Sequence, residues 1–259
     1  MKRRSSFSRT VFALTVVFLF MSLAVLVVYS FNGSRSGSWG GFSLRWYIKL
    51  FTDSPDLWRA FGNSAIIALG SALAATAIGT LGAVGVNWYR FRLRSYLRTI
   101  TFLPMILPEI IIGVSLLVFF SGLGLRLGLF TVFIAHVSFN LPFVFLLVLA
   151  RLEEFDFSIV EAARDLGANE RQTLFRVILP MTMPGIVSGF LTAVTLSLED
   201  FVITFFVTGP GATTLPLYVY SAIRFGVSPV INALSVVMIV GTVALTWSMR
   251  NFLKHIAAK

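Results

Sequence analysis

The segment EAARDLGANERQTLFRVILP, residues 161–180, is polar and charged and lies between two strongly apolar stretches. The 259-residue chain around it is 57% hydrophobic and only 12% charged, whereas soluble domains carry about a quarter charged residues. We therefore expect an integral membrane protein in which this segment is a loop outside the bilayer. Something other than lipid must recognise such a loop.

Composition also excludes several classes of protein. The net charge of +10 is not gathered into a basic patch with interleaved aromatic residues, so nucleic acid is not an expected partner. The absence of Cys excludes disulfides, thiolate metal sites and Cys nucleophiles. With two distant His residues and no HExxH motif, the groups that an enzyme or a metal site needs are missing. We expect no catalytic residues and no metal ligands.

Apolar runs predict six transmembrane helices, at about 20 residues per crossing. These runs are residues 10–31, 61–86, 99–121, 130–150, 181–207 and 231–249. Of the 21 Lys and Arg residues, fifteen fall on the side of the N-terminus, so the positive-inside rule predicts that both termini are cytoplasmic. The expected fold class is an all-α integral membrane protein with six transmembrane helices, and the loop at 151–180 is then cytoplasmic too.

Helix signals divide this loop into two short helices. Ser158 with Glu161 fits a capping box that begins the first helix, and Gly167 stands where a left-handed residue would end it. Asn169 with Gln172 fits a second, weaker cap. Residues at helical spacing give the first helix a small apolar face, formed by Ile159, Ala162, Ala163 and Leu166.

Charge alone leaves two interpretations of the loop open. Residues 151–180 hold six acidic residues and four Arg, while the other segments assigned to the cytoplasm are purely basic. Anionic lipid attracts basic segments, so this loop is not a typical lipid contact. It is either an ordinary solvated connection or a binding surface for another molecule.

The spacing of the motif favours a binding surface. The EAA triplet at 161–163, Gly167 after three intervening residues and the block that ends in Leu179-Pro180 resemble the EAA signature of permease subunits of ATP-binding-cassette importers, with Val177 in place of the usual Ile. In that family the loop is a coupling helix that docks in a groove of a separate ATPase and transmits its opening and closing. The resemblance assigns coupling to Glu161, Ala162, Ala163, Asp165, Gly167, Leu179 and Pro180.

The resemblance covers nearly the whole chain. Segments similar to the second permease subunit of spermidine/putrescine-type importers are VYSFN (28–32), FSLRWY (42–47), SLEDFVITFFVTGPGATTLPL (197–217) and VSPVINAL (227–234). They imply a type I importer fold in a bacterial cytoplasmic (inner) membrane, with a second permease subunit, an ATPase dimer and an extracytoplasmic substrate-binding protein as partners. The chain has no G-x-x-x-x-G-K-[ST] motif, so we expect ATP and Mg to bind the partner ATPase.

Start signals for helices indicate the domain boundaries. Ser54-Pro55 and Ser228-Pro229 fit N-cap and N1 pairs that begin the second and sixth spans, which places a core permease domain at 55–250. Residues 1–54, with the first span and an outer loop, form an added arm, and residues 251–259 form a cytoplasmic tail.

Three acidic residues fall within the predicted spans, where a charge costs at least a few kcal/mol. Glu109 follows Pro104 and Pro108 in the third span, and Glu199 and Asp200 are adjacent in the fifth. Carboxylates that face a cavity suit a cation, and the ammonium groups of a polyamine would form charge-assisted hydrogen bonds with them. The alternative is a buried, protonated or helix-capping carboxyl group. Related polyamine permeases more often carry Asp at the positions of Glu109 and Glu199, which leaves the exact substrate open.

Several other residues have two interpretations. Trp46, in the amphipathic segment SLRWYIKLF, either offers its ring to a cationic substrate or anchors the chain at the membrane interface. His136 has no second ligand at suitable spacing and is expected to be a hydrogen-bonded core residue. Gly185 and Gly189 form a GxxxG motif that allows close helix packing or a pivot.

The sequence thus predicts the permease subunit of an ATP-driven importer for a small cation, with spermidine or putrescine as the expected substrate. Another organic cation, an amino-acid-like solute or a metal ion are alternatives. A proton-coupled secondary transporter would account for intramembrane acids equally well. The EAA loop distinguishes the two classes, because only the importer needs an ATPase.

Overall fold

The computed structural model describes residues 6–35, 38–89, 91–154, 156, 158–224 and 229–257, and among these the side chains of residues 7–244. These residues form helices, with one isolated antiparallel bridge between Asn32 and Phe42. The chain divides into two compact units. One is Leu57–Tyr218, and the other combines the described residues up to Asp56 with those from Val219 onward.

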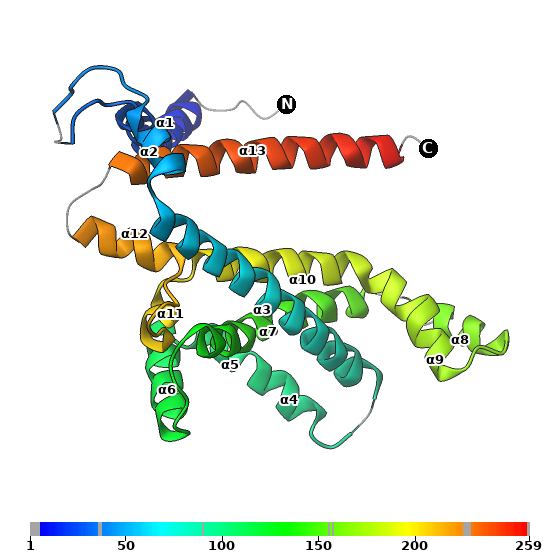
Figure 1. Ribbon diagram of the computed structural model, residues 1–259. Helices are drawn as coiled ribbons and strands as arrows, with labels where there is room; N and C mark the ends of the chain where they lie inside the picture. Colours follow the sequence, from blue (N-terminus) through cyan, green and yellow to red (C-terminus); the bar gives the residue numbers. More distant parts are fainter. Residues whose placement is uncertain are drawn as a thin grey trace. The chain divides into compact units, whose positions relative to one another are not determined.

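The unit Leu57–Tyr218 holds most of the helices (Figure 1). In chain order they are α3 (Pro55–Trp88), α4 (Arg94–Thr101), α5 (Leu103–Ile106), α6 (Glu109–Gly122), α7 (Leu129–Glu153), α8 (Ser158–Asp165), α9 (Glu170–Thr173), the π-helix η1 (Leu174–Ile178), α10 (Leu179–Glu199), α11 (Val202–Val207) and α12 (Leu215–Arg224). The unit boundaries fall inside α3 and α12.

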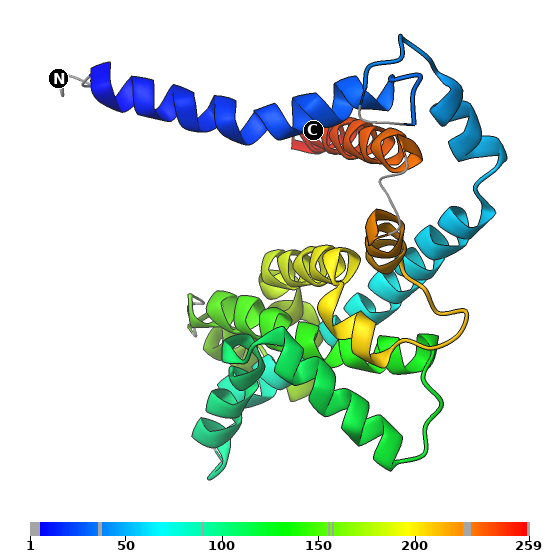
Figure 2. The ribbon, with the colours of Figure 1, turned by 90° about the vertical axis from the view of Figure 1, so that its left-hand side faces the viewer.

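The other unit contains α1 (Ser6–Ser30), α2 (Arg45–Thr52) and α13 (Pro229–Ala257). Both α1 and α2 pack against α13, as the two views show (Figures 1 and 2). Helix α13 begins at Pro229, as the sequence indicates, while Ser228 lies outside the described residues. The segment predicted as a tail is helical as far as Ala257.

Among the described residues, four helices are long and apolar enough to cross a membrane. They are residues 7–30, 55–88, 129–153 and 170–199, and the bent pair 94–106 and 109–122 counts as a fifth span if taken together. In α13 the side chains are described as far as Ala244, and the helix is apolar over Pro229–Ala244. The count of six and the orientation of the termini therefore stay predictions.

The third predicted span, 99–121, is divided into separate helices. Helices α5 and α6 are separated by Leu107 and Pro108, both extended, and the chain bends there by 107°. The ring of Pro108 disfavours the helical conformation for Leu107, which explains the break. As a consequence Glu109 is not in the middle of a helix but is the first residue of α6.

The fifth predicted span, 181–207, is also divided. Helix α10 ends at Glu199, Asp200 is extended, and α11 follows. At its other end α10 continues the π-helix, in which the Leu179 N–H donates to the carbonyl of Leu174, five residues back. The wider turn accommodates Pro180, which has no N–H and whose ring would clash with a carbonyl in a regular helix.

Helix α7 packs between α3 and α10 at very short range (Figure 1). A Cβ atom on Gly79 of α3 would lie 3.0 Å from Val144 Cβ, and one on Gly189 of α10 would lie 3.2 Å from Val144 Cα. On Gly185 it would lie 2.9 Å from the Leu147 carbonyl oxygen. The close packing predicted for the GxxxG motif is confirmed.

Candidate functional site

The connection between α7 and α10 carries the candidate coupling residues, and its first helix begins differently from the prediction. Ser158 is already the first residue of α8, and its backbone N–H donates to Asp156 Oδ1 at 3.0 Å. This backbone hydrogen bond is the main cause that lowers the pKa of the exposed Asp156 carboxyl, and a hydrogen bond from the Ser158 hydroxyl lowers it further. Asp156 is therefore ionised at neutral pH and is well suited to the positive end of the helix.

The end of α8 follows the prediction. Gly167 has φ +85°, a conformation that suits glycine, and its N–H donates to the Arg164 carbonyl at 2.9 Å. The Ala168 N–H donates to the Ala163 carbonyl at 3.0 Å. These two bonds form a Schellman motif, which ends the helix with its carbonyls paired.

The second helix of the loop is capped as predicted. Asn169 Oδ1 accepts from the Gln172 N–H, and Gln172 Oε1 accepts from the Asn169 N–H, both at 2.9 Å. Helix α9 then passes into η1 and α10 without a break, so that residues Glu170–Glu199 form one continuous helical rod. The order helix, Gly turn, helix is confirmed, and the turn is fixed on both sides.

The apolar face expected on α8 is largely exposed. Val160 anchors α8 in the core formed by α3, α7 and α10 and is 3% exposed. Leu166 is 89% exposed and Ile159 is 40% exposed. Glu161 and Asp165 are exposed as well. The helix thus presents apolar and acidic side chains outward.

Arg164 ties the loop to the end of α3. Its guanidinium lies 5.4 Å from the centre of the Trp88 ring and donates to Glu170 Oε1 at 2.9 Å. One side chain therefore joins α8 to both α9 and α3. These contacts hold the loop as a single body at the end of the α3–α7–α10 bundle.

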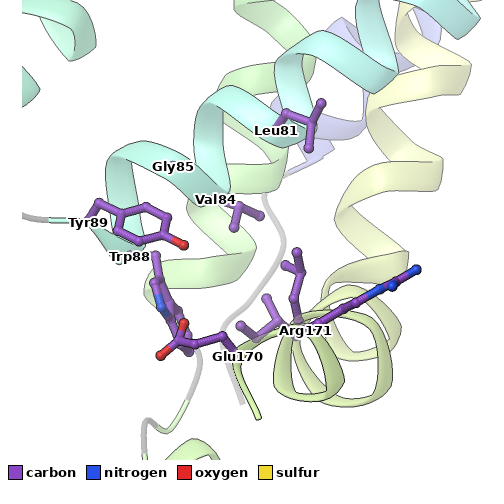
Figure 3. Close-up of a pocket in the computed structure, with 9 residues that line it drawn as sticks. Leu81, Val84, Gly85, Trp88, Tyr89, Glu170 and Arg171 are labelled. Carbon is purple, nitrogen blue, oxygen red and sulfur yellow. The ribbon is translucent and has the colours of Figure 1, made fainter.

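A hollow separates α9 and η1 from the last two turns of α3 (Figure 3). We call it the α3–α9 groove; it has a volume of about 300 Å³. The residues that line it are Leu81, Val84, Gly85, Trp88, Tyr89, Glu170, Arg171, Leu174 and Ile178. A smaller hollow of about 190 Å³ lies beside α8 and shares Trp88 with this groove.

Of the three acids assigned to the substrate pathway, Asp200 has a different environment from the prediction. Its carboxylate is buried and accepts hydrogen bonds from the backbone N–H groups of Ile203 and Thr204, at 3.2 and 2.9 Å, and from the Thr204 hydroxyl at 2.7 Å. His136 Nε2 lies 3.2 Å from the same carboxylate. Asp200 thus accepts the first-turn amides of α11 from the position before its N-cap Phe201, which corresponds to the helix-capping alternative.

Glu199 and Glu109 remain accessible. Both are exposed, Glu199 as the last residue of α10 and Glu109 as the first residue of α6. Gly113, one turn after Glu109, packs so closely on α11 that a Cβ there would lie 2.6 Å from the Phe206 ring. Glu109 thus lies one turn from the contact of α6 with α11, and Glu199 directly precedes Asp200 in the chain.

Trp46 is buried within its own unit. The side chain is 3% exposed, and its indole N–H donates to the Asn32 carbonyl at 2.7 Å. The Arg45 guanidinium lies 4.1 Å from the ring centre and that of Arg35 lies 5.9 Å away. Two cations of the chain therefore lie near the ring, and Trp46 helps to fix the loop that follows α1.

His136 is a buried core residue, as expected. Nδ1 lies 2.6 Å from Ser197 Oγ and Nε2 lies 2.9 Å from Thr204 Oγ1, so both ring nitrogens have a partner. Among the described residues, no group of three or more His, Asp or Glu side chains is placed to hold a metal ion.

Comparison with known proteins identifies the family. Residues 75–259, which include the whole α8–α9 loop, match the family described as binding-protein-dependent transport system inner membrane component. The chain belongs to this family. As an inner membrane component it is a multi-pass protein of the bacterial inner membrane, and its long apolar helices agree with that.

Relatives of this inner membrane component are similar over nearly its whole length. It is 41% identical over 238 residues to the spermidine/putrescine transport system permease protein PotC of Escherichia coli (strain K12), covering 92% of this chain and 88% of PotC. It is 41% identical over 264 residues to the putrescine transport system permease protein PotI of the same strain, covering 99% of this chain and 93% of PotI.

Solved structures give the fold. The inner membrane component matches, with a TM-score of 0.70 and 18% identity, a chain of a bacterial ABC transporter involved in the import of alginate, covering 97% of this chain and 99% of that one. A chain of the MetNI methionine ABC transporter in an inward-facing conformation matches with a TM-score of 0.57 and 21% identity over 74% and 90% of the two chains. The predicted fold of an ABC importer permease is confirmed.

Proposed function

We propose that this inner membrane component is the permease subunit of an ATP-driven polyamine importer and that the α8–α9 loop is where a separate ATPase binds. The observation that carries the substrate assignment is the 41% identity, over nearly the whole chain, to two permeases named for spermidine and putrescine. The exposed, capped loop supports the coupling role.

The coupling role follows from how the loop is attached. Its outward face offers Leu166 and Ile159 for an apolar contact and Glu161 and Asp165 for polar ones. A partner that binds this face acts on α9, which is continuous with α10, and through Arg164 on α3. Movement of the ATPase would thus reach the helices of the bundle as a rigid-body displacement, which alternating access requires.

Within this loop the proposed coupling residues have distinct tasks. Glu161 and Asp165 contact the ATPase, while Ala162 and Ala163 keep the face of α8 flat enough for close approach. Gly167 fixes the turn, and Leu179 and Pro180 form the junction between the π-helix and α10.

The assembly that this proposal requires contains further partners. A second permease subunit, different from this chain, completes the pathway, a dimer of ATPase subunits binds ATP and Mg, and an extracytoplasmic binding protein delivers the substrate. Six transmembrane helices with both termini in the cytoplasm place the loop on the side of the ATPase. The polyamine pathway is lined by Glu109 and Glu199, whose exposed carboxylates suit the ammonium groups of a polyamine.

Uptake by the reconstituted transporter tests the proposal. Proteoliposomes that hold the complete complex, with the binding protein outside and ATP inside, should accumulate labelled spermidine or putrescine, and vanadate should stop the uptake. Glu161→Lys should abolish uptake, whereas Glu154→Lys, the same charge change on an exposed residue at the end of α7, should leave it near normal. Uptake that needs a proton gradient but no ATP would contradict the proposal and favour a secondary transporter.

A further inference from the structure

We propose that the α3–α9 groove receives an apolar side chain of the ATPase subunit and so forms a second anchor beside the exposed face of α8. The inference rests on the proposed function, since it takes the ATPase as the partner of the loop. In the docking that the family resemblance implies, the permease loop enters a groove of the ATPase. At this second anchor the ATPase contributes the side chain and the permease contributes the groove.

The groove has an apolar floor and a polar rim (Figure 3). Val84 and Ile178 are buried at its floor, whereas Tyr89, Glu170 and Arg171 at the rim are exposed. The side chains of α3 form one wall and those of α9 and η1 form the other. An apolar floor inside a polar rim is the usual anatomy of a protein–protein anchor site.

The size of the groove favours a side chain over a free ligand. Its volume of about 300 Å³ lies at the lower limit of small-molecule pockets, which span about 300–1,000 Å³. A Cβ atom built on Gly85 meets no heavy atom within 4 Å, so the wall of α3 leaves open space at that point. One aromatic or aliphatic anchor of a partner would occupy such a space.

The chemistry of the rim favours a protein over lipid. Glu170 and Arg171 are charged and exposed, and both belong to the loop that carries the coupling residues. Charged side chains are not placed in the hydrocarbon region, so the mouth of the groove faces water or the headgroup region. Trp88 and Tyr89 at the end of α3 fit the same level, where aromatic residues are enriched.

The groove is also continuous with the coupling surface. Trp88 lines it on one side and lines the smaller hollow with Val160, Glu161 and Arg164 on the other. A partner seated on α8 and Glu161 therefore reaches the groove without leaving the surface of the loop. Filling the groove would press α9 and α3 against the same partner, so both walls would follow its motion.

Photo-crosslinking tests the groove separately from the loop. Benzoylphenylalanine would replace Tyr89 at the rim or Leu166 on α8, each in the complete complex in native membranes. We expect both positions to give an adduct with the ATPase. An adduct from Leu166 but none from Tyr89, or a Tyr89 adduct with lipid or the second permease, would overturn the groove proposal and leave the proposed function intact. Absence of an ATPase adduct at both positions would overturn both.

A substitution that fills the groove gives a second measurement. Gly85→Leu should weaken binding of the purified ATPase to the reconstituted permease pair by about tenfold, which corresponds to about 1.4 kcal/mol. Gly62→Leu is the matched control, because a Cβ at Gly62 on the same helix also meets no atom within 4 Å but lies outside the groove. Equal ATPase affinity of the two variants, both eluting as monodisperse protein, would refute the anchor.

Discussion

Replacing Asp200 should damage the fold of the bundle before it affects substrate binding. In the structure this carboxylate accepts two backbone N–H bonds and one hydroxyl bond at the start of α11, and His136 lies beside it. We expect Asp200→Ala to lower the stability of the complex strongly and Asp200→Asn to lower it less. Glu199→Gln, at the exposed neighbouring position, should leave stability unchanged.

The magnitudes follow from the bonds that are lost. Asp200→Ala leaves the N–H groups of Ile203 and Thr204 without their acceptor in a buried site, and loss of a cap together with unpaired buried amides costs about 2–4 kcal/mol. Asn keeps one of the two acceptor oxygens. Its NH₂ group at the position of Oδ2 would face the Thr204 N–H and hydroxyl, which are donors themselves. We expect a cost of about 1–2 kcal/mol for Asp200→Asn.

Two measurements distinguish a helix-capping role of Asp200 from a substrate-binding role. They are the melting temperature of the purified complex and the polyamine uptake per folded complex. A cap predicts that the melting temperature falls in the order wild type, Asn, Ala, and that the uptake of the remaining folded Asn variant stays substantial. The reasoning is refuted if Asp200→Ala melts like the wild type while uptake is abolished, because that pattern belongs to a residue in the pathway.

Other substitutions address the loop and the helix packing. Gly167→Ala forces a side chain to φ +85° and should cost about 1 kcal/mol, seen as faster proteolysis of the loop; unchanged cleavage would argue against a fixed turn. Gly189→Leu drives a side chain into Val144 and should reduce the yield of folded protein severely, as measured by size-exclusion chromatography; a normal yield would mean that α7 and α10 are not closely packed. Trp88→Ala removes the ring under Arg164 and should raise the ATP hydrolysed per polyamine transported, whereas Trp88→Phe, which keeps a ring worth about 0.5–1 kcal/mol, should stay near normal. Equal ratios for the two variants would exclude this contact from coupling.

Local signals in the sequence predicted the loop well because they act over a few residues. The Gly167 turn and the Asn169–Gln172 cap depend on side chains and backbone groups within a single turn, and both appear as expected. The start of α8 differs from the prediction because two residues, Asp156 and Ser158, can each cap a helix there. Asp156 accepts the Ser158 N–H, so Ser158 becomes the first residue of the helix.

The acids could not be assigned from sequence in the same way. Hydropathy treats residues 181–207 as one apolar run, but Asp200 ends α10 because its side chain binds the next helix. A signal was present, since Asp just before an apolar run is typical of the start of a helix, but the length of the apolar run favoured a single span. The burial of Trp46 depends on Asn32 and Arg45, and the α3–α9 groove joins residues far apart in the chain. Periodicity contains no information about such contacts.

The unbroken rod Glu170–Glu199 has a mechanical consequence. Its 30 residues extend for about 45 Å at about 1.5 Å per residue, while the hydrocarbon layer is about 30 Å thick. The rod is about 15 Å longer than this layer, so in the proposed orientation the end that bears α9 extends outside the membrane. A tilt of about 10° about the Glu199 end would move the α9 end through about 8 Å. The π turn, which lies near the α9 end, sets how much of this movement is passed on to α10.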